Sequence, residues 1–235
     1  MSYSGNSELW ALEQGAPNYN RMLVRRFARA LPEPTAEHFT VLDFGAGIGT
    51  VSKLWIDEGM GPIHCYEPDV VQCNQIIDRG IQAYSELNKL PTEYDLVFSS
   101  NVLEHIEDDL EVLVEIKNLL LKNSGILAIY VPAFQILYSA IDEKVGHYRR
   151  YSKKKLSKTV KKAGYEVITC EYVDSLGFFA ALAVRILKLN VGVATNQTVL
   201  KLYDDVILPM SLFLDRIGLK RIFGKNIILF ARKAL

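Results

Sequence analysis

One short glycine-rich segment constrains the fold of this chain more than any other feature. Residues 41–50 read VLDFGAGIGT, an apolar run that leads into glycines at every second position. Such glycines permit a tight turn from a strand into a helix and let a ligand approach the backbone. A second apolar run, residues 63–66, ends at Glu67, whose two oxygens can accept hydrogen bonds from both hydroxyls of a ribose. The pattern therefore predicts a nucleotide-binding βαβ unit.

Two details distinguish between the cofactors that such a unit can hold. The nicotinamide fingerprint places its third glycine three residues after the second. Here Thr50 occupies that position, and Gly49 comes one residue earlier. Asp43 lies two residues before Gly45, where a carboxylate would repel a pyrophosphate but suit a ligand that carries an ammonium and a sulfonium. These details favour S-adenosylmethionine, and an NAD(P)-dependent oxidoreductase remains the alternative.

Three segments of the chain resemble motifs of the class I S-adenosylmethionine-dependent methyltransferases. Residues 43–49 resemble the first motif, residues 66–69 the second, acidic motif, and residues 94–106 the fourth strand with the loop after it. The resemblance covers about residues 38–172 and a closing strand near the C-terminus. It implies a cofactor site made of Asp43, Phe44, Gly45, Ala46, Gly47, Gly49, Glu67, Pro68, Ser85, Asn101 and Val102.

One position departs from the pattern of that family. Many members carry an Asp after the third strand that contacts the adenine amino group. Here Ser85 and Glu86 follow Tyr84. Either side chain, or the backbone alone, is expected to take over the adenine contact.

The order of apolar runs and helical segments predicts an α/β fold. We expect a Rossmann-like, doubly wound, mostly parallel sheet of seven strands with helices on both faces. The strands are expected near residues 40–44, 63–66, 81–84, 95–99, 126–131, 166–172 and 226–231. The helices between them are expected near residues 50–58, 69–79, 108–121 and 152–163, with a turn at 123–125.

A single domain over residues 1–235 is expected, with helical additions. Its parts are an N-terminal helical cap (1–35), the core (36–174), a helical insertion (175–222) and the final strand (223–235). The insertion is expected to hold helices at about 176–189 and 199–215, the second kinked by Pro209. An insertion of this length is usually functional, as a lid or an interface.

Composition excludes several classes of protein. The formal net charge is zero, so no global charge bias calls for nucleic acid or a membrane. Cys65, Cys73 and Cys170 are scattered, which favours a reducing compartment, and their spacing predicts no metal site. The first five residues lack the pattern of a secretory signal. We expect a cytoplasmic location.

The loop after the fourth strand supplies the first candidates for chemistry. Asn101 and His105 are four residues apart, so a helical turn would point both into the cleft at the carboxyl edge of the sheet. His105 titrates in the range useful for a base. The alternatives are that Asn101 caps the next helix and that His105 has a structural role. Glu104 is expected to be a structural acceptor or a surface group.

A second cluster of candidates follows the fifth strand. Residues 146–151 read GHYRRY, and the segment resembles one found after this strand in a subgroup of bacterial methyltransferases, in which the position of Asp142 also belongs to the pattern. We expect a loop in which His147 is a base oriented by Asp142. Polar candidates beside them are Tyr148 and Arg149.

An arginine of this loop, Arg149 or Arg150, would pair with an anionic group of the substrate. In the alternative interpretation both arginines bind nearby acids, such as Asp142 or the segment near Asp108, and only hold the loop. Ser152 is expected to cap the helix that follows.

Two surfaces bear on partners. Residues 144–162 contain nine Lys or Arg and no acid, which suits an anionic partner but more often marks a solvated helix face. Nucleic acid is not favoured, because few aromatic side chains accompany the basic run. The insertion over residues 176–214 is very apolar. It is expected to pack on the core, cover the site, bind an apolar substrate, dimerise the protein or lie on the inner face of a membrane.

Together these features predict an S-adenosylmethionine-dependent methyltransferase. The acceptor is expected to be an oxygen or nitrogen of a small molecule or saccharide. The resemblance of the loop suggests cell-surface glycan or lipid-linked glycan metabolism. The alternative to the enzyme is a catalytically silent module that binds the cofactor on the same fold.

Overall fold

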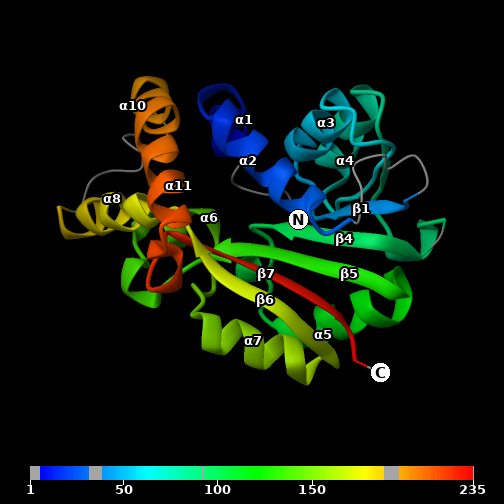
Figure 1. The fold of residues 1–235 in the computed structure, drawn as a ribbon. Helices are drawn as coiled ribbons and strands as arrows, with labels where there is room; N and C mark the ends of the chain where they lie inside the picture. The colour runs from blue at the N-terminus through cyan, green and yellow to red at the C-terminus, as the bar shows by residue number, and fades with distance from the viewer. Residues whose placement is uncertain (1–5, 32–38, 92, 188–195, 235) are drawn as a thin grey trace.

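The computed structural model describes residues 6–31, 39–91, 93–187 and 196–234. Within them, seven strands form one sheet in the order β3-β2-β1-β4-β5-β7-β6, in which only β7 runs antiparallel to its neighbours (Figure 1). This confirms the predicted fold class. The strands are β1 (Val41–Phe44), β2 (His64–Tyr66), β3 (Gln82–Tyr84), β4 (Tyr94–Ser100), β5 (Leu121–Pro132), β6 (Tyr165–Val173) and β7 (Asn226–Lys233).

Helices cover both faces of the sheet because each strand presents apolar side chains to both sides. One face packs against α2 (Pro17–Ala28), α3 (Thr50–Asp57) and α4 (Val70–Asp78), where the ring of Phe27 stacks on Phe98 at 4.5 Å. The other face packs against α5 (Asp109–Glu115) and α7 (Lys153–Lys162), through buried side chains that include Leu113, Leu156 and Val160.

The lysine run lies on α7. Ser152 caps this helix with its side chain, as predicted, by accepting a hydrogen bond from the backbone N–H of Lys155. The helix buries Leu156 and Val160 and leaves Lys154, Lys158 and most of the other lysines exposed. This is the arrangement of an ordinary amphipathic helix with a solvated basic face.

The region between α5 and β5 differs from expectation. The predicted helix over 108–121 changes into a π-helical turn, η4 (Ile116–Leu120), and β5 begins at Leu121, not at residue 126. Tyr94 pairs with Leu121 and Leu96 with Ile126, so the predicted turn at 123–125 lies in an irregularity of the strand. A Cβ on Gly125 would lie 2.8 Å from the carbonyl oxygen of Tyr94, so the glycine permits a close approach of two strands.

The N-terminal helices contact the insertion, and α1 (Asn6–Gly15) lies close to α10 (Gln197–Leu202) (Figure 1). The N-terminal pair is α1 and α2, and the Gln197 amide of the insertion donates a hydrogen bond to the carbonyl of Ala11 at 3.2 Å. The insertion contains α8 (Ser175–Ile186), α10, the π-helical η6 (Tyr203–Ile207), α11 (Leu208–Arg216) and η7 (Leu219–Arg221). Pro209 lies in the first turn of α11, directly after η6.

An acidic side chain of the insertion accepts hydrogen bonds from the N-terminus of α2. Ala16, which precedes α2, has no capping side chain. The fully buried Asp204 instead accepts hydrogen bonds from the backbone N–H groups of Asn18 and Tyr19, each at 2.8 Å. A carboxylate is favourable there because it satisfies unpaired N–H groups at the positive end of the helix dipole. The insertion is therefore joined to the N-terminal segment by specific polar contacts.

Candidate active site

The glycine-rich loop forms the predicted tight turn at the carboxyl end of β1. The N–H groups of Gly45 and Ala46 both donate to the carbonyl of Tyr66, at 2.8 and 3.1 Å, which ties the loop to β2. Gly45, Gly47 and Gly49 have φ values of 78°, 57° and 79°, a region that disfavours side chains. The loop therefore presents bare backbone at the edge where open α/β sheets bind ligands.

Two buried carboxylates flank this loop. Asp43, 2% exposed, accepts a hydrogen bond from Ser52 Oγ at 2.7 Å, and burial raises its pKa to about 7. Glu67, 7% exposed, accepts hydrogen bonds from the backbone N–H groups of Gly47 at 2.8 Å and Asp69 at 2.9 Å. A cationic ligand would compensate the desolvation of Asp43. The carboxylates and the glycine backbone thus fit a cofactor that combines positive charge with a ribose.

The remaining candidates for cofactor contacts differ in burial and in their contact with this loop. Val102 lies against Gly45, because a Cβ on that glycine would lie 2.5 Å from Val102 Cγ2. Ser85 directly follows β3 and is half-buried, whereas Pro68 is exposed. Glu86, the alternative adenine contact, is exposed and pairs with Lys89. Of the two side chains, Ser85 is therefore the better candidate.

Asn101 does not cap the next helix. The short 3₁₀ helix η3 (Leu103–His105) is preceded by Val102 and has no side-chain cap. Asn101 instead has a φ of 55°, and its N–H donates to the carbonyl of Tyr130 at 2.8 Å. A non-glycine residue in this conformation is uncommon, and here it changes the direction of the backbone after the strand.

Tyr19 of α2 was not singled out by the sequence. Its side chain lies beside Asn101 and Tyr130, with the ring centroids of the two tyrosines 6.2 Å apart, and burial raises the pKa of Tyr19 to about 12. It brings the N-terminal segment to the carboxyl ends of β4 and β5. Its only sequence signal is a tyrosine in an amphipathic helix, which does not distinguish a site residue from a core residue.

The two histidine candidates, separated by 42 residues in sequence, meet in space. The rings of His105 and His147 lie 4.5 Å apart between centroids. Between them and the core lies Glu104, which is fully buried and whose Oε1 is 3.9 Å from His147 Nε2. The expectation that Glu104 is a surface group is wrong, because η3 turns its side chain inward.

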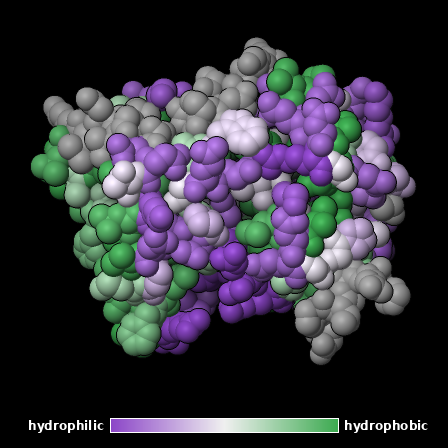
Figure 2. All heavy atoms as spheres, turned by 90° about the horizontal axis from the view of Figure 1, so that it is seen from above, coloured by the Kyte–Doolittle hydropathy of each residue, from purple (hydrophilic) through white to green (hydrophobic). Residues whose placement is uncertain are grey.

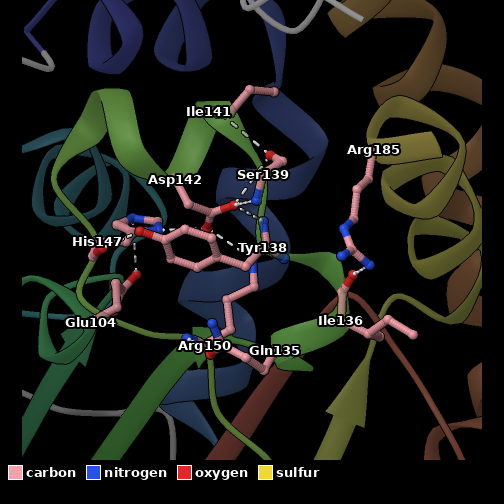
Figure 3. A network of polar contacts seen from close by, with 10 residues as sticks. All are labelled: Glu104, Gln135, Ile136, Tyr138, Ser139, Ile141, Asp142, His147, Arg150 and Arg185. Carbon is pink, nitrogen blue, oxygen red and sulfur yellow. Dashed lines mark hydrogen bonds and ion pairs between the residues drawn. The ribbon is translucent and has the colours of Figure 1, made fainter. Parts of the chain in front are cut away.

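Asp142 is the centre of the polar network in Figure 3. Its Oδ1 lies 2.7 Å from His147 Nδ1, and Arg150 donates to both carboxylate oxygens at 2.8 and 3.0 Å. The segment is not the loop that we expected: Asp142 lies in the short helix α6 (Ala140–Val145), where it forms a capping box with Ser139. Local capping chemistry thus fixes the carboxylate that holds the imidazole.

The arginines follow the alternative interpretation. Arg150 is bound to Asp142, and Arg149 donates to the carbonyl of Glu107 at 2.7 Å and lies 3.3 Å from Asp109. Tyr148 is 56% exposed, outside this network. Both arginines therefore help to hold the segment in place, and their pairing with an anionic substrate stays a prediction.

Replacement of Asp142 by asparagine is expected to destabilise the protein by about 3 kcal/mol at pH 7, because it leaves the buried Arg150 without its counter-charge. Hydrogen bonds from His147 and Arg150 lower the pKa of Asp142 to about 2. A depressed pKa adds stability that is present above the unfolded pKa of about 4 and is lost as the pH falls towards 2. Urea unfolding at pH 7 and pH 3 should therefore show a smaller difference between Asp142→Asn and the parent protein at pH 3. Equal stabilities at pH 7 would contradict the assignment.

A second polar cluster, unpredicted, lies under the insertion. Asp174 follows β6 with a φ of 67°, caps α8 through the N–H of Gly177 and accepts a hydrogen bond from Tyr203 Oη. Lys225 lies with its ammonium 5.0 Å from the Tyr203 ring centre, and burial lowers its pKa. These residues come from three distant segments, so their proximity depends on the path of the insertion.

Comparisons with known proteins identify the family of the chain. A family model described as a methyltransferase domain matches residues 15–170. No curated protein sequence matches the chain significantly.

Several solved structures share the fold at low identity. A putative sarcosine dimethylglycine methyltransferase from Galdieria sulphuraria is 18% identical with a TM-score of 0.59, and the match covers 92% of this chain and 84% of that one. Phosphoethanolamine N-methyltransferase 2 from Haemonchus contortus, in complex with S-adenosyl-L-methionine, is 18% identical with a TM-score of 0.62, over 100% of this chain and 58% of that one. An S-adenosylmethionine-dependent methyltransferase from Archaeoglobus fulgidus is 17% identical with a TM-score of 0.57, over 91% and 94%.

The family match spans most of the chain and includes both carboxylates of the glycine-loop site. The nicotinamide alternative is therefore wrong. The chain belongs to the methyltransferase-domain family with the class I fold, and S-adenosylmethionine is its cofactor.

Proposed function

We propose that the protein transfers a methyl group to an oxygen or nitrogen of a small molecule or saccharide, with a hydroxyl as the favoured acceptor. The observation that carries this proposal is the imidazole of His147, held by Asp142 at 2.7 Å beside His105. A hydroxyl is a weak nucleophile that benefits from a base, and a histidine oriented by a carboxylate is a suitable one.

The roles of the residues follow from their positions. S-adenosylmethionine supplies a methyl group on a positively charged sulfur when it is bound. Glu67 and the glycine loop hold and orient the cofactor, and Asp43 complements its positive charge. His147 Nε2 accepts the proton of the acceptor hydroxyl, while the Asp142 carboxylate fixes the ring. The main contribution of the protein is alignment of the acceptor with the methyl carbon.

The surface of the insertion supports an acceptor that carries a lipid. Figure 2 shows hydrophobic side chains gathered on the left, where the insertion lies in Figure 1. The exposed apolar side chains of this region include Phe179, Ile186, Leu187, Met210, Phe213, Ile217 and Ile222. Across the described residues, no helix is both long and apolar enough to cross a membrane. We therefore propose peripheral contact with a membrane.

The loop resemblance adds a substrate class to this proposal. The segment at 146–151 resembles one in a subgroup of bacterial methyltransferases, and this resemblance suggests a substrate from cell-surface glycan metabolism. A lipid-linked saccharide would place its sugar hydroxyl at His147 and its lipid along the insertion.

A panel assay tests the proposed function. The protein is incubated with S-adenosylmethionine and lipid-linked saccharides, free sugars or phenols, and S-adenosylhomocysteine is measured. With the active acceptor, His147→Gln is expected to lower the rate by about 100-fold, the lower range for loss of a general base. Its affinity for S-adenosylhomocysteine is expected to remain unchanged.

The exposed Glu143 of α6 provides a matched control, and Glu143→Gln should leave the rate unchanged. Binding of the cofactor without product from any acceptor would instead support the catalytically silent module. A His147→Gln variant with full activity would exclude the proposed base.

A further inference from the structure

The structure assigns a second ligand to the acceptor side of the site: we infer that Glu104, His105 and His147 bind a divalent transition-metal cation of the zinc type. The catalytic role of the ion rests on the proposed function. Binding of the ion to the three side chains does not depend on that function. One ligand atom from each of the three side chains lies within 4.8 Å of the other two. The spacing of these residues along the chain predicts no metal site, because His147 is joined to the other two only by the fold.

Glu104 is the first reason for this inference. Its side chain is fully buried, and neither carboxylate oxygen has a hydrogen-bond partner among the described residues. Its carboxylate points towards His147 (Figure 3). Buried polar groups are nearly always hydrogen-bonded, and buried charges are paired or coordinate metals. A cation between Glu104 and the histidines would supply the missing partner.

The distances are compatible with one shared ion. Glu104 Oε1 and His147 Nε2 are 3.9 Å apart, too far for a hydrogen bond. Two ligands that each lie about 2.0 Å from a tetrahedral zinc ion are roughly 3.3 Å apart. Small rotations of the side chains are therefore enough to close the site around an ion.

The surroundings of His147 are those of a metal ligand. Its Nδ1 bonds to Asp142, which leaves Nε2 directed towards Glu104. Histidine ligands usually bond through their other ring nitrogen to a carboxylate or carbonyl, which fixes the ring for coordination. Arg150 in turn holds Asp142 by two hydrogen bonds.

The donor set determines the kind of ion. Two imidazoles and one carboxylate suit zinc and other first-row metals, whereas magnesium and calcium prefer oxygen ligands. Three protein ligands leave a coordination position open, as in catalytic zinc sites. The acceptor hydroxyl would occupy that position, and the ion would lower its pKa. With an ion bound, His147 Nε2 would be a ligand and not the base, so the proton of the hydroxyl would pass to solvent water.

A titration of the full chain tests the site. Protein treated with a chelator and dialysed is titrated with zinc chloride in a calorimeter, and we expect one equivalent to bind. Glu104→Gln and His147→Gln are expected to weaken binding by at least about 10-fold, as loss of a ligand should exceed the effect of losing its supporting partner. Glu107→Gln, an exposed carboxylate in the same loop, should bind zinc as the parent does.

Cobalt provides a second readout that does not depend on affinity alone. The visible absorption of Co²⁺ reports its ligands, and the bands of the parent protein should change or vanish in His105→Gln. Absence of zinc binding at 100-fold molar excess over the protein, or equal binding in all three ligand variants, would overturn the inference.

The failure of this inference can be told from failure of the proposed function. S-adenosylhomocysteine is titrated into the metal-free protein in parallel. Cofactor binding without zinc binding would contradict only the inference of a metal site. Zinc binding at the three residues without cofactor binding would support the inference of a metal site and contradict the proposed methyl transfer.

Discussion

Glu67→Gln is expected to bind S-adenosylhomocysteine about 100-fold more weakly than the parent protein. The carboxylate accepts hydrogen bonds from the backbone of Gly47 and Asp69 through different oxygens. Glutamine can accept through only one oxygen, and its NH₂ group would face a backbone N–H donor. The change thus displaces the glycine loop and removes an acceptor for the ribose. Each lost hydrogen bond to a charged group contributes about 1.5–3 kcal/mol, so 100-fold corresponds to one or two of them.

Isothermal titration with S-adenosylhomocysteine measures this effect. Glu111→Gln, an exposed carboxylate of α5, is the control and should bind as the parent does. Circular dichroism would verify that the Glu67→Gln protein is folded. Unchanged affinity in a folded Glu67→Gln protein would show that the carboxylate has no part in the cofactor site.

Gly45→Ala is expected to destabilise the protein by about 2–5 kcal/mol and to abolish cofactor binding. The residue has a φ of 78°, which costs an alanine about 1–2 kcal/mol. The added Cβ would also lie 2.5 Å from Val102 Cγ2 and 2.9 Å from Cγ1, and relieving such an overlap costs about 1–3 kcal/mol. The two costs act together because the loop is tied to β2 on its other side.

A matched glycine separates the two costs. Gly59 has a φ of 72°, but no atom of the described residues lies within 4 Å of an added Cβ, so Gly59→Ala should show the backbone cost alone. In the double variant Gly45→Ala/Val102→Ala, stability should recover in part, because the two γ-carbons are removed. Urea unfolding of the four proteins measures the differences. Equal losses for Gly45→Ala and Gly59→Ala would rule out the contact with Val102.

The core of the fold was predictable because its information is local in sequence. Most strands of the parallel part are followed by a helix with a recognisable start or stop, such as Asp69 before α4 or Gly80 after it. The handedness of such connections leaves few arrangements of the strands. The irregular start of β5 was missed because Asn123, Ser124 and Gly125 are typical of turns, whereas here they interrupt a strand pair.

The candidate site was predictable in part. Asp142 and His147 are five residues apart, so their contact was within the reach of pattern reasoning. Glu104 was misjudged because a glutamate in a loop is usually exposed, and only the tertiary structure shows that η3 turns it inward. Tyr19 and Lys225 approach the site from the two ends of the chain, where no local pattern indicates a shared position.

The contact of Asp204 with the start of α2 also constrains how the chain folds. The hydrogen bonds join residues that are 186 and 185 positions apart, so the bonded groups meet only after nearly the whole chain has been synthesised. Until then the first turn of α2 lacks its acceptors, and contacts of this sequence separation form slowly. The nascent protein should therefore pair the parallel strands β1 to β5 before its helical cap closes, whereas β7 can complete the sheet only once residues 226–233 have been synthesised. A ribosome-stalled chain that ends before Gln197 should leave the N-terminal helices accessible to proteases.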